Sequence, residues 1–363
     1  MTQCGVSRAR ARLIGVTVAV SVLVLAFALA GGPLRAESSK TPTTQPADAN
    51  ATDAADSKDT EKVKYFSAPE GGWKKDVETG WRKKVPLSGL EKSKYGKVAW
   101  FHLAVPKDYT PEKKWPLMVL LHGGPGGKPD DIVGFFRGGL LERGVIQVYP
   151  NAIIRQLLEW NYPHSGAYIL QVVRQVAVEY RIDPRRVYLA GVSMGGGGTW
   201  VQGALGRDVW AAIGPISGWY GASQSPSVEL LKGVPIYCMH GSADPAVPAS
   251  RSRYAFSLLK KFRAVKAYSQ TPDPNDLARH DCIYREVQGA GHNCFLPWKK
   301  RGAIELGKMM GWMLSRKRED PADLDKWAAY LARHGKRFGW KAKGSPVGTY
   351  GDADTGKRGK RDD

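Results

Sequence analysis

The stretch RVYLAGVSMGGGGTWVQGAL, residues 186–205, decides how the rest of this chain can fold. Residues 186–190 alternate and are apolar enough for a buried strand, and residues 199–205 suit a helix. Between them, residues 191–195 have the spacing G-x-S-x-G, centred on Ser193. A sharp turn from strand to helix strains its middle residue and lifts that side chain clear of the sheet. The stretch therefore predicts a reactive serine at the end of a buried strand.

The neighbours of Ser193 fit this interpretation. Gly191 and Gly195 lack side chains that would clash where the chain crosses itself. The following helix would place its positive end at Ser193, where a developing anion is stabilised. A glycine-rich turn with a passive serine is the alternative. A phosphate-binding loop is set aside, because no Gly-Lys-Ser/Thr follows the glycines.

Two further motifs supply the groups that a serine nucleophile needs. A predicted strand at 235–239 ends in HGSADPAVP, which contains Asp244, and the last predicted strand, 282–287, leads to GAGHN, which contains His292. An imidazole takes the proton of the serine hydroxyl, and a carboxylate orients the imidazole. The alternatives are a turn role for Asp244, since Asp-Pro favours turns, and a structural role for His292.

A glycine-rich loop predicts the site that would bind the oxyanion of the reaction. The sequence HGGPGG, residues 122–127, directly follows an apolar strand predicted over 115–121. Proline has no N–H, so we expect the amide of Gly124 to be the donor on this side, with Gly123 second. The amide of Met194 is the expected second donor, since such amides stabilise the charge of the transition state. His122 and His240 are expected to have structural roles in their loops.

Strands and helices alternate along the chain, which predicts an α/β fold with a mainly parallel central sheet and helices on both faces. The expected strands are residues 98–105, 115–121, 145–149, 186–190, 211–216, 235–239 and 282–287. The expected helices are residues 166–181, 199–205, 251–262 and 299–314. Residues 151–165 and 266–281 are expected to form irregular insertions.

The four motifs, HGGPGG, DPRRVYLAGVSMGGGGTW, HGSADPAVP and GAGHN, together resemble the α/β-hydrolase superfamily over residues 98–315. Within it, the chain is most similar to secreted carboxylesterases of the dienelactone hydrolase, feruloyl esterase and polyhydroxyalkanoate depolymerase type. It also resembles the hydrolase domain of prolyl oligopeptidases. The resemblance implies a serine esterase that needs no cofactor or metal and acts on a small-molecule or polymer-linked ester. Pro125 and Cys294 depart from the pattern of these families.

Loop aromatics predict where the substrate would bind. Trp160, Trp219, Tyr220 and Phe295 are expected to line an acyl or aryl pocket, and simple packing is the alternative. The cysteines that follow the first apolar segment are Cys238, Cys282 and Cys294. We hypothesise that Cys282 and Cys294 form a disulfide, which would fix the loop that carries His292. The sequence contains no C-x-x-C spacing of the kind that would indicate a zinc site.

The termini predict export. Residues 1–36 combine Arg8, Arg10 and Arg12 with an apolar run, residues 13–30, which is typical of a signal peptide. If it stayed uncleaved, the run would serve as an N-terminal membrane anchor. We expect a disordered linker over 37–60, a lead-in over 61–97, the catalytic domain over 98–315 and a basic, loosely ordered tail over 316–363. Within this tail, residues 323–332 suit a short helix. The location would be periplasmic or extracellular.

The formal net charge of +20 indicates attraction to anionic surfaces, such as envelope polymers or acidic polysaccharide, and a solvated basic face with no partner is the alternative. A nucleic-acid partner is not expected. Two other functions compete with the esterase. A prolyl oligopeptidase-type peptidase would need a propeller domain, and residues 61–97 are too few to build one. A non-catalytic envelope-associated binding protein would not need the intact set of Ser193, Asp244 and His292.

Overall fold

The structure is a computed structural model that describes residues 65–88, 99–124, 126–152, 159–221, 226–296 and 300–335. The predicted signal peptide or anchor (1–36) and linker (37–60) lie outside the described residues. So does the tail beyond residue 335. Within the described ranges, no helix has the length and apolar character needed to cross a membrane.

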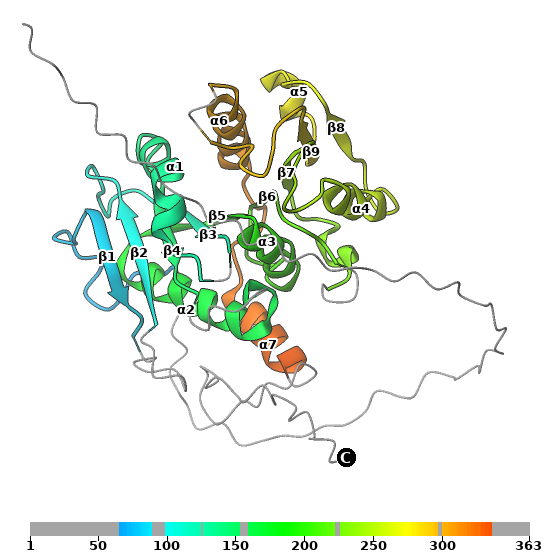
Figure 1. Ribbon diagram of the computed structural model, residues 1–363. Helices are drawn as coiled ribbons and strands as arrows, with labels where there is room; N and C mark the ends of the chain where they lie inside the picture. Colours follow the sequence, from blue (N-terminus) through cyan, green and yellow to red (C-terminus); the bar gives the residue numbers. More distant parts are fainter. Residues whose placement is uncertain are drawn as a thin grey trace, which may run out of the picture. The chain divides into compact units, whose positions relative to one another are not determined.

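A single nine-stranded sheet forms the centre of the domain, in the order β1-β2-β4-β3-β5-β6-β7-β9-β8. Figure 1 follows this order from β1, in blue, to β8, in yellow. The pairs β1–β2 and β2–β4 are antiparallel and all later pairs are parallel, as the alternating pattern predicted. The strands are β1 (Gly80–Pro86), β2 (Trp100–Val105), β3 (Trp115–Leu121), β4 (Ile146–Pro150), β5 (Ile182–Val192), β6 (Ala212–Ile216), β7 (Ile236–Gly241), β8 (Lys266–Tyr268) and β9 (Cys282–Val287).

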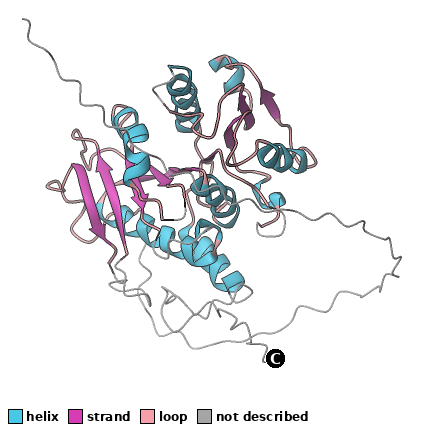
Figure 2. Cartoon of the chain, in the orientation of Figure 1, coloured by secondary structure: helices cyan, strands magenta, loops and turns pink. Residues whose placement is uncertain are grey.

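Helices cover both faces of the sheet (Figure 2). The helices are α1 (Asp130–Leu141), α2 (Pro163–Glu179), α3 (Met194–Leu205), α4 (Ser250–Leu259), α5 (Pro274–Ala278), α6 (Lys300–Ser315) and α7 (Leu324–Gly335). There are also two 3₁₀ turns, η1 (Glu159–Asn161), which precedes α2, and η2 (Val228–Leu231), which lies between β6 and β7.

Two hydrophobic cores lie on opposite faces of the sheet, because successive side chains of a strand alternate between its faces. Leu117 and Val119 of β3 pack in the core that contains side chains of α2, α3, α4 and α7. Met118 and Leu120 pack in the other core, with side chains of α1, α5 and α6. The prediction of helices on both faces is therefore confirmed.

Parts of the segments expected to be irregular form regular structure. The lead-in 61–97 contains β1, which pairs with β2 at one edge of the sheet. The polar insertion 266–281 contains β8 and α5, and the insertion 151–165 contains η1 and the first turn of α2. Helix α3 begins at Met194, so the four glycines lie inside the helix that was expected only from Thr199.

The expectation of a loosely ordered tail from residue 316 has to be corrected for residues 316–335. Helix α7 packs beside α2, and Figure 1 shows the two helices next to each other. Trp327 is only 1% exposed and lies edge-on to Trp210, with 5.2 Å between the ring centroids. Leu324 and Leu331 are buried in the same core. The short helix expected at residues 323–332 is present, and its one apolar face is sufficient to dock the segment.

Replacing Trp327 with alanine should therefore lower the free energy of unfolding by about 3–5 kcal/mol, because the change opens a cavity in the core. Urea denaturation followed by fluorescence and circular dichroism measures the loss. Val178 lies on α2 and is 46% exposed, so Val178→Ala is a matched control. It should change the same free energy by no more than about 0.5 kcal/mol. Equal stabilities of Trp327→Ala and the wild type would contradict the docking of α7.

Candidate active site

Ser193 sits in a strained backbone turn between β5 and α3. Its φ of 58° and ψ of −116° lie where non-glycine residues are rarely found. Its amide donates to the carbonyl oxygen of Ile216 at 2.9 Å, and its own carbonyl accepts from the amide of Gly197, also at 2.9 Å. Strain of this kind persists only where surrounding structure enforces it, and it concentrates at functional sites. The turn expected around Ser193 is thus present.

Close backbone packing explains the glycines around Ser193. A Cβ on Gly195 would fall well inside 3.0 Å of the carbonyl oxygen of Leu121, at the end of β3. A Cβ on Gly191 would meet the carbonyl oxygen of Gly195 in the same way. Real Cβ atoms essentially never approach backbone so closely. Glycine at both positions lets the turn lie directly on the end of β3.

The glycine-rich loop after β3 lies beside Ser193. A Cβ on Gly123 would be 3.0 Å from the Cβ of Ser193 and 3.7 Å from its Oγ. Gly124 has a φ of +68°, which few other residues adopt. Of the two expected oxyanion donors in this loop, Gly123 is the one whose place beside Ser193 is defined. The role of the Gly124 amide stays a prediction, and Pro125 lies outside the described residues.

His122 holds this loop in shape, as expected for a structural histidine. Its Nε2 accepts from the amide of Ala152 at 3.1 Å, so Nδ1 carries the proton and donates to the carbonyl of Gly123 at 3.0 Å. The indole Nε1 of Trp160 donates to the carbonyl of His122 at 3.0 Å. The loop beside Ser193 is therefore anchored by buried hydrogen bonds.

Asp244 and His292 form a hydrogen-bonded pair at the carboxyl ends of β7 and β9. Nδ1 of His292 lies 2.7 Å from Oδ2 of Asp244, whose side chain is fully buried. The other carboxylate oxygen, Oδ1, accepts from the amides of Ala246 and Val247, each at 2.9 Å. Burial alone would raise the pKa of Asp244, but hydrogen bonds from His240, His292 and the Val247 amide outweigh burial and hold that pKa well below its usual range.

Ser217, which the sequence analysis did not single out, connects the two halves of the site. It follows β6 with a φ of 46°, and its buried Oγ donates to the carbonyl of His292 at 2.7 Å. The preceding residue, Ile216, accepts from the amide of Ser193. Adjacent residues at the end of β6 thus contact the serine turn and the histidine loop. The available signal was that Ser217 directly follows the strand predicted over residues 211–216.

His240 also has a contact beyond the turn role expected for it. Its Nε2 lies 3.1 Å from Oδ2 of Asp244, the oxygen that His292 also contacts. The HGSAD spacing places His240 four residues before Asp244, but nothing in that spacing tells a turn histidine from one that contacts the carboxylate.

The aromatic residues expected to line a pocket are mostly packed into the domain. Trp160 is fully buried and lies edge-on to His122, with 5.2 Å between the centroids. Tyr220 and Phe295 are also buried, against Trp200 and Phe135 respectively. Trp219 is half-buried over Gly197. The structure shows packing contacts for all four, and a role for them in binding substrate stays a prediction.

The hypothesis of a disulfide between Cys282 and Cys294 is wrong. Cys238, Cys282 and Cys294 are all buried, free thiols. Cys282 packs in the core on one face of the sheet and Cys294 in the core on the other face. Burial raises the pKa of Cys282 to about 11 and that of Cys294 to about 12, so both stay as thiols. The loop of His292 is held by the Ser217 hydrogen bond instead.

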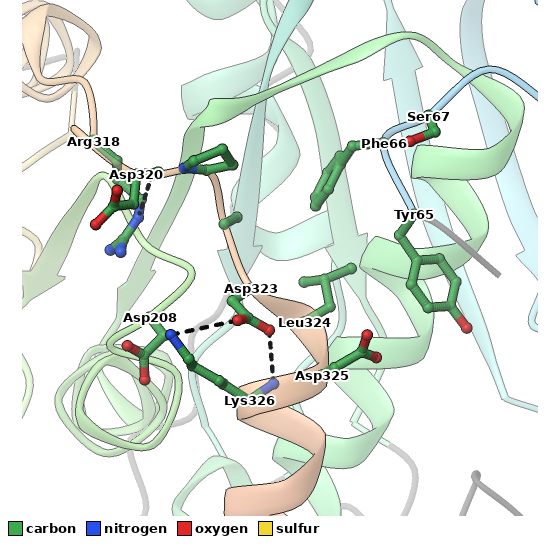
Figure 3. Close-up of a pocket in the computed structure, with 12 residues that line it drawn as sticks. Tyr65, Phe66, Ser67, Asp208, Arg318, Asp320, Asp323, Leu324, Asp325 and Lys326 are labelled. Carbon is green, nitrogen blue, oxygen red and sulfur yellow. Dashed lines mark hydrogen bonds and ion pairs between the residues drawn. The ribbon is translucent and has the colours of Figure 1, made fainter. Parts of the chain in front are cut away.

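Two cavities bear on where a substrate could bind. The larger, about 720 Å³, lies between residues 65–67 and the start of α7 (Figure 3). Its charged residues pair locally, since Lys326 contacts the carboxylate of Asp323 through its amide at 2.8 Å and its Nζ at 3.5 Å. Neither Ser193 nor His292 lines it. The second cavity, about 360 Å³, is lined by residues 287–294, and so by His292.

Metal ligation is not evident in the part of the chain that the structure describes. Among those residues, no group of three or more His, Cys, Asp or Glu side chains could hold a metal ion.

The strand order and the loops at the carboxyl ends of β3, β5, β7 and β9 define an α/β-hydrolase fold.

No protein-family model matches the chain. Part of it is similar to a poly(3-hydroxybutyrate) depolymerase of Ralstonia pickettii, at 28% identity over 136 residues, which is 32% of this chain and 28% of the depolymerase.

A second relative is a bifunctional acetylxylan esterase/xylanase of Neocallimastix patriciarum, 30% identical over 148 residues, 39% of this chain and 21% of the relative. The matches thus span less than a third of either relative. Among solved structures, a thermophilic esterase of Thermogutta terrifontis is 15% identical with a TM-score of 0.45, covering 61% of this chain and 90% of that chain. An acylaminoacyl peptidase is 16% identical with a TM-score of 0.47, covering 68% and 43%.

The depressed pKa of Asp244 predicts how stability depends on pH. A carboxyl whose pKa is lower in the folded state adds stability that is fully present above the unfolded pKa of about 3.9 and is lost as the pH falls below it. Asp244→Asn lacks this contribution. The difference in unfolding free energy between wild type and variant, measured by urea denaturation, should therefore shrink between about pH 6 and pH 3. A difference that stays constant over this range would contradict the role of the carboxylate.

Proposed function

We propose that this protein is a serine hydrolase that cleaves carboxylic esters, with Ser193 as nucleophile, His292 as base and Asp244 as its orienting acid. The observation that carries the proposal is the hydrogen bond of 2.7 Å between His292 and the buried carboxylate of Asp244. The strained turn of Ser193 also supports the proposal. A further support is that Ser193 and the loop of His292 both contact the end of β6, through Ile216 and Ser217.

The proposed mechanism follows from the proton positions. Asp244 accepts from Nδ1–H of His292, which leaves Nε2 free to take the proton of the Ser193 hydroxyl. Ser193 Oγ then attacks the ester carbonyl. The tetrahedral oxyanion accepts hydrogen bonds from the amide of Met194, at the positive end of α3, and from the glycine loop after β3. His292 returns the proton to the leaving alcohol, and water hydrolyses the acyl-enzyme by the same steps.

The substrate class is drawn from the two curated relatives. Their names describe a poly(3-hydroxybutyrate) depolymerase and an acetylxylan esterase, both of which act on esters carried by polymers. We infer a polymer-linked or small-molecule carboxylic ester for this chain. Export of the protein and attraction of its basic charge to anionic envelope polymers remain part of the proposal, supported by the arginines and apolar run of residues 1–36 and the net charge of +20.

Loss of the nucleophile should remove turnover. Ser193→Ala should lower kcat/KM for p-nitrophenyl acetate by at least about 10³-fold, because the covalent step is lost while amides that bind the oxyanion remain. His292→Ala should have a comparable effect. His102 is a buried histidine of β2 that contacts Asp130, so His102→Leu is the matched control. Retention of more than about a tenth of the wild-type rate by Ser193→Ala would overturn the assignment of the nucleophile.

Comparison of substrates should separate esterase from peptidase. A panel of p-nitrophenyl esters of increasing acyl length and of aromatic acids should be hydrolysed with measurable kcat/KM. Prolyl anilides should be turned over much more slowly. The opposite preference would favour a prolyl oligopeptidase-type peptidase, and no turnover of either class would favour a binding protein.

A further inference from the structure

The carboxylate of Asp244 is shared by two imidazoles. Oδ2 contacts Nδ1 of His292 at 2.7 Å and Nε2 of His240 at 3.1 Å. His240 belongs to the carboxyl end of β7, and its side chain and that of Asp244 are both fully buried. The second imidazole has no part in the proton transfers described above, so its place against the acid needs a separate explanation.

The protonation of His240 follows from its neighbours. Nε2 faces two acceptors, the carboxylate of Asp244 and the carbonyl oxygen of Val247 at 2.8 Å, so Nε2 must carry a proton. Nδ1 lies 2.8 Å from the hydroxyl of Ser252. That hydroxyl can donate to Nδ1, and it accepts from the thiol of Cys238 at 3.5 Å. With Nδ1 as the acceptor, the Ser252 hydroxyl donates to His240 at 2.8 Å rather than to the carbonyl of Gly218 at 3.4 Å. The donors then run in one direction, from Cys238 through Ser252 and His240 to Asp244.

This arrangement saturates the carboxylate. Oδ1 accepts from the amides of Ala246 and Val247, and Oδ2 accepts from the two imidazoles. An ionised carboxylate offers about four acceptor sites. With all four used, the group cannot rotate without losing a buried hydrogen bond, and its interaction with His292 keeps one geometry.

The turn that carries Asp244 has supports besides the bond from His240 to the carbonyl of Val247. Backbone bonds hold it, from the amide of Ser242 to Val287 at 3.0 Å and from that of Ala243 to Ala290 at 2.9 Å. These bonds remain when the side chain of residue 240 is replaced. A histidine that only supported the turn would need the carbonyl of Val247 and not the carboxylate.

We propose that His240 is a positioning residue of the hydrolase site. Its Nε2–H fixes Oδ2 of Asp244, and through that oxygen it sets the tautomer and orientation of His292. The inference rests on the proposed function, since it assigns a role in activating Ser193. Removal of the donor at residue 240 should therefore slow the reaction of Ser193 even though residue 240 contacts neither the nucleophile nor the base.

The rate of labelling by a fluorophosphonate probe tests this role, because the probe reports activation of Ser193 without knowledge of the natural substrate. His240→Leu should lower the second-order rate constant about tenfold or more, as expected for loss of a hydrogen bond to a charged group. His240→Gln should restore most of that rate, because the glutamine amide can donate from a position close to Nε2. A leucine variant as fast as wild type, or a glutamine variant as slow as leucine, would overturn the proposal.

A matched control and a coupling measurement separate positioning from general destabilisation. His102 is another buried imidazole next to a carboxylate, with Nε2 3.2 Å from Asp130, so His102→Leu should leave the labelling rate unchanged. In an Asp244→Asn background, His240→Leu should cost no further rate, because the two residues act as one unit. Losses that multiply independently would contradict the inference.

A third measurement uses wild-type protein, so it is decisive even when His240→Leu fails to fold. The chain has seven histidines, which makes ¹⁵N-histidine spectra simple to assign. We expect His240 to show a slowly exchanging Nε2–H and His292 an Nδ1–H. A His240 ring protonated only at Nδ1 would overturn the proposal. If the probe labels the wild type no faster than it labels Ser193→Ala, the proposed function fails. If the probe labels the wild type at Ser193 but the rate does not change with residue 240, only this inference fails.

Discussion

At Gly191, Gly195, Gly196 and Gly198 the backbone lies so close to its neighbours that no side chain fits at these four positions. A Cβ on Gly196 would meet the carbonyl of Ile216, and one on Gly198 would meet the Cβ of Trp160, both well inside 3.0 Å. Because α3 sits directly on the end of β3, on β6 and on η1, the loops that follow β3 and β6 are brought to Ser193. The site thus depends on close backbone packing more than on long side chains reaching across a gap.

The parts of the site that could be predicted from sequence are those encoded locally. Ser193, Asp244 and His292 each follow an apolar strand, and the chemistry of each residue type limits its role. The contacts of Ser217 and His240 could not be predicted in the same way. They depend on β6, β7 and β9 lying next to one another, and sequence periodicity does not specify that order. The carboxylate of Asp244 was expected to have one imidazole partner and has two.

The errors have physical causes of the same kind. Strand β1 has the sequence GWRKKVP, which looks like a polar lead-in, because an edge strand with exposed lysines needs little apolar surface. Helix α7 was expected only as a short helix in a loose tail, but one face with Trp327 and Leu331 is enough to bury it. The expected disulfide was wrong because Cys282 packs in the core on one face of the sheet and Cys294 in the core on the other face. In each case a contact between distant parts of the chain outweighed the local composition.

The glycines that allow α3 to pack so closely also make it a poor helix. In a helix interior each glycine costs roughly 0.5–1 kcal/mol relative to alanine, so the run from Gly195 to Gly198 would not hold a helical shape by itself. Most of the stability of such a helix comes from its tertiary neighbours. The turn of Ser193 is therefore stable only together with its contacts to β3, β6 and Trp160. An unfolded chain carries every residue of the site but lacks the geometry that exposes the nucleophile.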